Sequence, residues 1–163
     1  MNPTPPLLID HVRELLTRSV PEVFSTMFTL EARPSEPRNL HALGETLVVA
    51  SVGFAGAVNG VVYLHVSAPF ARLLAGRMLG MADEEFDGDE MINDAMGELS
   101  NMVVGAVKSR LCDDGSPCVL TIPSIVRGQS FSVGATGCSD RRLLGFHCGE
   151  GEMVLELQMK PAE

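Results

Sequence analysis

The chain has 163 residues with a hydrophobic fraction of 45%, enough for one packed domain or for two small half-domains that share a core. Its formal net charge of −9 at pH 7 argues against nucleic acid, which needs a basic footprint, and against an anionic membrane surface. No apolar run could span a bilayer and residues 1–8 lack the pattern of a secretory signal, so we expect a cytoplasmic protein.

The elements predicted for the first part of the chain are a helix at 8–29, a loop at 31–45, strands at 46–54 and 60–66, and a short helix ending near Gly80. Pro21 should kink or split the first helix, because proline has no amide hydrogen to donate. Asn59-Gly60 is typical of the turn of a β-hairpin. Ser67 and Pro69 are typical of the start of a helix.

A second long helix follows a loop at 81–88 and runs to about Leu111. Asp87 and Glu90 have the spacing of a capping box, which places the start of this helix there. The strands predicted after it lie near residues 118–126, 129–136, 142–148 and 152–159. A helix followed by strands, twice over, predicts an α+β fold with two long helices packed on one largely antiparallel sheet.

Asp94, Glu98 and Asn101 stand out on the second helix. Their spacing of four and three residues stacks the three side chains on one face, within an arc of roughly 60°. Gly97 and Gly105 lie along the same face, where a larger side chain would obstruct an approaching molecule. The spacing alone leaves two interpretations open: an ordinary solvated face, or a surface that meets another molecule.

This pattern resembles a known family. Asp-x3-Glu-x2-Asn is followed after 21 residues by Pro123, and a glycine-rich hairpin at 51–67 precedes it. Together these features resemble the CheC/CheX/FliY phosphatases of bacterial chemotaxis, over about residues 8 to 159. The resemblance implies a single domain over 1–163 with a CheC-like pseudo-symmetric duplication, the halves being about 8–80 and about 87–159.

The duplication permits an internal comparison. Asp94, Glu98 and Asn101 are called the stripe below. In the first helix, the positions that correspond best to the stripe hold Arg18, Glu22 and Ser25. Serine cannot present a carboxamide of equal reach, so the first helix motif is degenerate. We therefore expect one active face, on the second helix, as in single-site members that resemble CheX.

The resemblance also implies a function. The partner is a phosphorylated CheY-like receiver of two-component signalling, and the reaction is hydrolysis of its aspartyl-phosphate. Asn101 would orient the attacking water, Glu98 would pair with the receiver's active-site lysine, and Asp94 would support the helix or the rim of the contact. The receiver would supply Mg²⁺, so no cofactor or metal of the chain's own is implied.

Three site residues have no chemistry of their own. Gly97 and Gly105 would admit close approach of the receiver. Pro123 cannot donate to a sheet ladder, so it marks a strand edge or a bulge and could shape the docking surface. Exposed sheet edges could also pair two copies of the chain as a homodimer.

Other motifs are weak. The four cysteines match no zinc pattern and are expected to be reduced thiols: Cys112, Cys118, Cys138 and Cys148. No histidine has an identifiable catalytic partner. Two rival functions stay open: a receiver-binding adaptor without catalysis, and a small-ligand sensing domain of the same fold.

Overall fold

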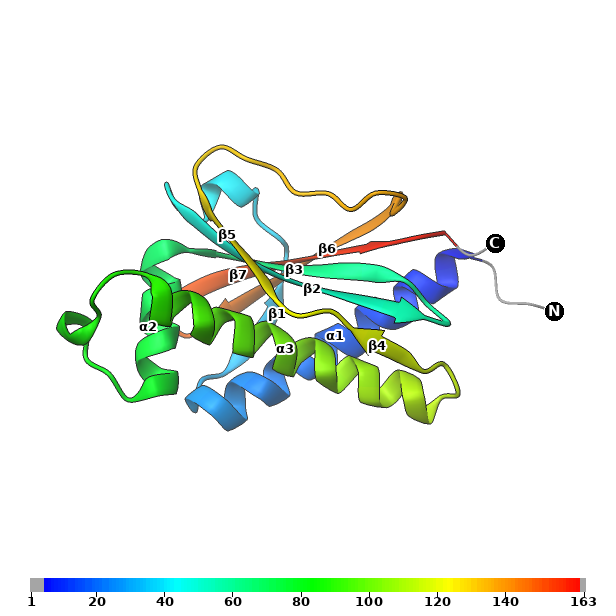
Figure 1. The fold of residues 1–163 in the computed structure, drawn as a ribbon, viewed down its shortest axis with the longest axis horizontal. Coiled ribbons are helices and arrows are strands. Elements are labelled where there is room, and N and C mark those ends of the chain that lie inside the picture. The colour runs from blue at the N-terminus through cyan, green and yellow to red at the C-terminus, as the bar shows by residue number, and fades with distance from the viewer. Residues whose placement is uncertain (1–4, 162–163) are drawn as a thin grey trace.

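A seven-stranded sheet with three helices on one face makes up the fold (Figure 1). The computed structural model describes residues 5–161, and their side chains from residue 8 onward. The helices are α1 (Pro5–Phe28), α2 (Ala68–Leu79) and α3 (Glu90–Asp113), with 3₁₀ turns η1 (Leu40–Ala42) and η2 (Asp83–Glu85). The strands are β1 (Ala32–Ser35), β2 (Leu47–Gly56), β3 (Gly60–Ser67), β4 (Cys118–Leu120), β5 (Ser124–Gly128), β6 (Asp140–Cys148) and β7 (Gly151–Met159).

The sheet has the strand order β1-β6-β7-β3-β2-β4, and β5 also pairs with β2. Every pairing is antiparallel, which confirms the predicted α+β class. The hairpins β2–β3 and β6–β7 meet where β3 pairs with β7. A short strand of each predicted half pairs with a strand of the other half: β1 pairs with β6, and β5 pairs with β2. Two copies of one helix-and-strand unit would produce this exchange, although the duplication itself stays a prediction.

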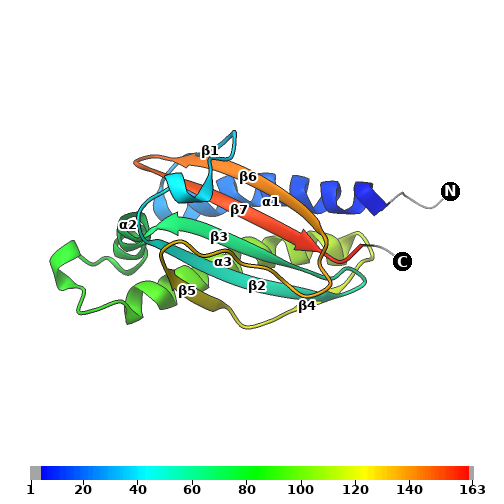
Figure 2. The same ribbon diagram turned by 90° about the horizontal axis from the view of Figure 1, so that it is seen from above.

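The main core lies between the sheet and the helices, which all cover the same face (Figure 2). Alternate residues of each strand point into it, as the period of two requires, including Ala50 of β2, Leu64 of β3 and Leu155 of β7. The β2–β3 hairpin and α2 lie where the sequence predicts them. Ser67 caps α2 by accepting a hydrogen bond from the Phe70 amide, at 3.2 Å.

The opposite, outer face of the sheet carries a smaller apolar cluster beside a buried polar network. Leu47, Val49 and Tyr63 form the cluster, and Phe131 and Val133 from the segment between β5 and β6 pack on it. This segment was predicted to be a strand at 129–136, and that prediction is wrong. Its alternating apolar residues reflect packing across a sheet face, which has the same period of two as a paired strand.

Three other predictions need correction. The expected loop at 31–45 contains β1 and η1, and Pro34 is tolerated in β1 because this edge strand pairs on one side only. The expected strand at 118–126 is interrupted, since residues 121–123 separate β4 from β5. Pro21 does not split the first helix, because α1 continues through it to Phe28, whose ring packs against Phe24 at a centroid distance of 4.9 Å.

The predicted capping box at Asp87 and Glu90 is also wrong. The N-cap of α3 is Asp89, and its side chain makes no capping hydrogen bond. The Asp89 carboxylate lies 3.6 Å from the Arg127 guanidinium of β5 instead. An ion pair to the sheet edge therefore replaces the capping bond at the start of this helix.

The buried network of the outer face is centred on Glu156 of β7. Its side chain is 2% exposed and accepts hydrogen bonds from His65 at 3.1 Å, Arg141 at 2.7 Å and Gln158 at 2.6 Å. Burial by itself raises the pKa of the Glu156 carboxyl. The hydrogen bonds outweigh this effect and lower the pKa from its ordinary value of 4.5 to about 2.

This shift predicts a specific acid sensitivity. Because the folded pKa lies below the unfolded one, the stabilisation is complete above about pH 4.5 and is lost as the pH falls toward about 2. Roughly 3 kcal/mol of unfolding free energy should disappear across this window. Urea denaturation between pH 2.5 and 7 should show that Glu156→Gln is less stable than the wild type at pH 7. The difference in unfolding free energy between the two proteins should narrow as the pH falls. Glu36→Gln, at an exposed position, should run parallel to the wild type, whereas a parallel Glu156→Gln curve would contradict the assignment.

Candidate functional site

Helix α3 is fixed in one orientation by its buried face. Leu99 and Val103 are fully buried, and Ser19 Oγ of α1 donates a 2.9 Å hydrogen bond to the Val103 carbonyl oxygen. Arg110 of α3 also forms an ion pair with Glu22 of α1, with 3.3 Å between Nη2 and Oε1. The opposite face of α3 is thereby held toward solvent.

The stripe of Asp94, Glu98 and Asn101 lies on this solvent face, as the spacing predicts. Asp94 and Glu98 are exposed and Asn101 is partly exposed. Within residues 8–161, none of the three side chains takes part in a hydrogen bond or ion pair; those of α3 involve Asn93, Ser109 and Arg110. Two carboxylates and one carboxamide are therefore available to another molecule.

Gly97 does not lie open beside the stripe. It is buried, and a Cβ atom added there would be 3.4 Å from Pro123 Cβ and 3.6 Å from Pro123 Cγ. The expectation that Gly97 admits an approaching partner is therefore wrong. Its missing side chain admits Pro123 instead, so that the segment between β4 and β5 can cross α3 in close contact.

Gly105 differs from Gly97. It is partly exposed, and a Cβ atom added there would meet nothing within 4 Å. The solvent face of α3 therefore stays unobstructed for one turn beyond Asn101, in line with the expected position of Gly105.

Arg127 of β5 is a site residue that sequence reasoning missed. Its Nη2 donates a 2.9 Å hydrogen bond to Asn93 Oδ1, one residue before Asp94, in addition to its ion pair with Asp89. Arg127 thus ties the first turns of the site helix to the sheet edge. Its only signal in the sequence is a cation within an otherwise apolar strand pattern, which does not identify a partner.

The corresponding face of α1 carries Arg18, Glu22 and Ser25, all exposed. Glu22 is engaged by Arg110, at the seam between the two helices. The carboxylate of this face is therefore used within the fold, unlike Glu98.

The histidines and cysteines form no competing site among the described residues. His65 is buried in the Glu156 network. All four cysteines are free thiols, and burial raises the pKa of Cys148 to about 12. No group of three metal-binding side chains occurs in the part of the chain that the structure describes. None of the described helices is long and apolar enough to cross a membrane.

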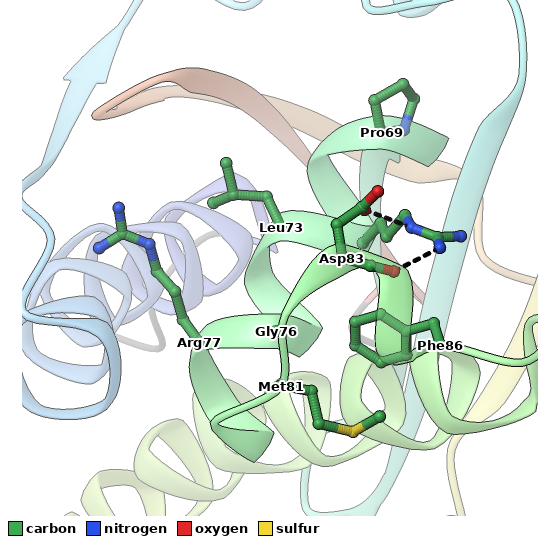
Figure 3. A pocket seen from close by; sticks show the side chains of 8 residues that line it. Pro69, Leu73, Gly76, Arg77, Met81, Asp83 and Phe86 are labelled. Atoms are coloured by element: carbon green, nitrogen blue, oxygen red, sulfur yellow. Dashed lines mark hydrogen bonds and ion pairs between the residues drawn. The ribbon is translucent and has the colours of Figure 1, made fainter.

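An open pocket of about 400 Å³ lies between α2 and η2, and no stripe residue lines it (Figure 3). Two guanidinium groups line the pocket, those of Arg72 and Arg77. The Arg72 group is engaged by both the carboxylate and the backbone carbonyl of Asp83, and it lies 5.4 Å from the centroid of the Phe86 ring. The Arg77 group donates a 3.5 Å hydrogen bond to the Phe28 carbonyl oxygen. The pocket is thus separate from the stripe, which lies on the surface of a helix.

The chain is similar to known proteins of bacterial chemotaxis. Residues 48–146 match the profile of the family described as Chemotaxis phosphatase CheX. The chain is 26% identical over 124 residues to the CheY-P phosphatase CheX of Thermotoga maritima, covering 75% of this chain and 79% of that protein.

Solved structures share the fold. CheX from Desulfovibrio desulfuricans has a TM-score of 0.76 at 22% identity, over 92% of this chain and 99% of that one. A chain of the CheX–CheY–BeF3–Mg²⁺ complex from Borrelia burgdorferi has a TM-score of 0.72 at 18% identity, over 90% and 96%.

An antiparallel sheet with three helices on one face is the fold of the CheX and CheC-like proteins. The family profile spans more than half of the chain and includes the whole of α3. The chain belongs to the CheX family, which confirms the resemblance found in its sequence.

The two site glycines should respond differently to substitution. Gly105→Ala should raise the unfolding free energy by up to about 1 kcal/mol, because alanine is the better helix former and the methyl group meets nothing. Gly97→Leu should lower it, because the side chain would have to displace Pro123. Thermal denaturation of both variants checks this. A stable Gly97→Leu variant would show that the Pro123 contact is loose.

Proposed function

We propose that this chain is a phosphatase that hydrolyses the aspartyl-phosphate of a CheY-like receiver in chemotaxis signalling. The observation that carries the proposal is the Glu98–Asn101 pair, which α3 presents to solvent without a side-chain partner among residues 8–161. Membership of the CheX family supports the proposal, and so do a relative that is a CheY-P phosphatase and a solved CheX–CheY complex. We expect the protein to act in the cytoplasm.

Asn101 is the proposed catalytic residue. Its carboxamide offers one acceptor and two donors without a charge that would repel the phosphoryl oxygens. It would hold a water molecule in line with the P–O bond to the receiver's aspartate. The water oxygen bonds to phosphorus as that P–O bond breaks, which frees the aspartate carboxylate, and both protons of the water leave with the phosphate. Positioning of this kind can remove several kcal/mol of a barrier.

Glu98 is the proposed docking residue. It lies one turn from Asn101 on the same face, so a receiver lysine beside the phosphoryl group could pair with Glu98 while Asn101 reaches the water. Asp94, one turn further back, would support the contact at its rim. The receiver would supply Mg²⁺, and no residue of this chain is assigned to hold a metal.

The rival functions make different predictions. An adaptor would bind the receiver and leave the lifetime of its phosphate unchanged. A small-ligand sensor would be stabilised by its ligand without any receiver. A homodimer through the sheet edges would be compatible with phosphatase function and would appear in light scattering.

Asn101→Ala should reduce kcat for the phosphorylated cognate receiver by about 100-fold, because the water is no longer positioned. The isosteric Asn101→Asp should also fail, since its charge would repel the phosphoryl group. The measurement is the decay of the phosphorylated receiver, with circular dichroism to show that each variant is folded. Ser109→Ala, on the same helix, is the matched control. Equal decay rates for wild type and Asn101→Ala would exclude the catalytic role.

Glu98→Ala should raise KM by roughly tenfold and leave kcat at saturating receiver nearly unchanged, because docking and not chemistry is impaired. Asp113→Ala is a suitable control, since it removes an exposed acid at the far end of α3. Steady-state kinetics over a range of receiver concentrations separates the two constants. A large fall in kcat would instead place Glu98 in the chemical step.

A further inference from the structure

Exposed apolar side chains occur beside the stripe. Six large hydrophobic residues are exposed in the described chain: Met27, Leu79, Met91, Val119, Ile122 and Val126. Met91 lies at the start of α3 and Ile122 in the segment that crosses α3, whereas Val119 and Val126 belong to strands β4 and β5. Ile122 is the most exposed of the six, at 86%. A single exposed hydrophobic residue is ordinary, so what sets Ile122 apart is how it is held and where it lies.

The exposure of Ile122 is imposed by its neighbours. The Thr121 amide donates to the Gly53 carbonyl oxygen at 2.9 Å, and the Gly53 amide donates back to Thr121 Oγ1 at 2.9 Å. On the other side, Pro123 is packed on Gly97 of α3. The backbone at residue 122 is thus fixed on both sides. As a result the Ile122 side chain stays exposed to water and is not buried by the rest of the fold. An apolar group that is rigid before binding loses little entropy when a partner covers it.

Ile122 and Met91 border the stripe. Pro123 packs on Gly97, which is adjacent to Glu98 and about one turn from both Asp94 and Asn101. Met91 is 47% exposed and precedes Glu98 by two turns, so it falls on the same face of the helix. A surface that covers Glu98 and Asn101 would also meet Ile122.

The stripe by itself is too small to hold a protein. A stable protein complex buries about 800 Å² on each partner, with an apolar centre and a polar rim. Three polar side chains on one helix face cannot provide this, and charged groups that stay near water add little affinity. The remaining area has to come from the flanks, where the exposed apolar side chains are.

We propose that Ile122, together with Met91, is an apolar anchor that docks the receiver beside its phosphorylated aspartate. This inference rests on the proposed function and names the residues that supply affinity, as distinct from chemistry. The occupant is the receiver and not a second copy of the chain. A second copy would bring another pair of stripe carboxylates to a molecule of net charge −9, whereas a receiver site contributes a lysine and a metal ion. Strand pairing at this edge is also disfavoured, since β4 has only three residues and Pro123 lacks a donor.

The test is binding of the cognate receiver, loaded with Mg²⁺ and beryllofluoride as a stable mimic of the phosphoryl group. Ile122→Ser should weaken this binding at least tenfold by calorimetry, and Met91→Ser should weaken it less. In the hydrolysis assay, Ile122→Ser should raise KM by the same factor with kcat unchanged within twofold. Val126→Ser is the matched control, because Val126 belongs to the same edge but lies opposite Val49 on the outer face of the sheet. It should bind as the wild type does.

Unchanged receiver affinity in Ile122→Ser would overturn the proposal. So would a change in oligomeric state with unaltered binding per protomer, which would make the edge a dimer contact. Failure of the proposed function gives a different result. A wild type that binds the loaded receiver and does not hydrolyse it would exclude the phosphatase, while loss of that binding in Ile122→Ser would still support the anchor.

Discussion

The contact between Pro123 and Gly97 is the constraint on which the rest of the site depends. Because Gly97 has no bulky side chain, the segment that leaves β4 can cross α3 in close contact and enter β5 at Ser124, which pairs with Ser51 of β2. The same segment is bonded to Gly53 through Thr121. Site helix, crossing segment and sheet edge therefore form one unit. The stripe keeps a fixed orientation relative to the side chains that border it.

Acidic residues are used in two distinct ways. Glu156 is buried and satisfied by three side chains, so its charge contributes to folding stability. Asp94 and Glu98 are exposed and make no ion pair within the described chain, so their charges contribute little to stability. The same residue type thus serves the fold on one face of the sheet and is left for a partner on the other. α3 can hold unpaired acids toward solvent because the separate apolar core between helices and sheet fixes its orientation.

The features that the sequence predicts correctly depend mostly on one element, although the capping box at Asp87 and the split at Pro21 were wrong. The 3.6-residue period placed the stripe on the outside of α3, and Ser67 and Gly80 marked the ends of α2. Features that depend on contact between distant segments were missed. β1 exists because it pairs with β6, Arg127 matters because it meets Asp89 and Asn93, and Gly97 is buried by a proline 26 positions along the chain. A local pattern contains no information about which segment will lie over a given face.

In the proposed reaction, affinity for the receiver and the chemical step depend on different residues. Asn101 acts only through its position relative to a water and a phosphoryl group, which the buried face of α3 and the docked receiver determine together. A change at an exposed border residue leaves that relation intact and alters only how often the complex forms. A side chain larger than a methyl group at Gly97 would move the crossing segment relative to the stripe, so that a receiver docked on both would no longer bring its phosphoryl group and the water to Asn101. Loss of stability, loss of affinity and loss of catalysis would then appear together, although Gly97 touches neither substrate nor partner.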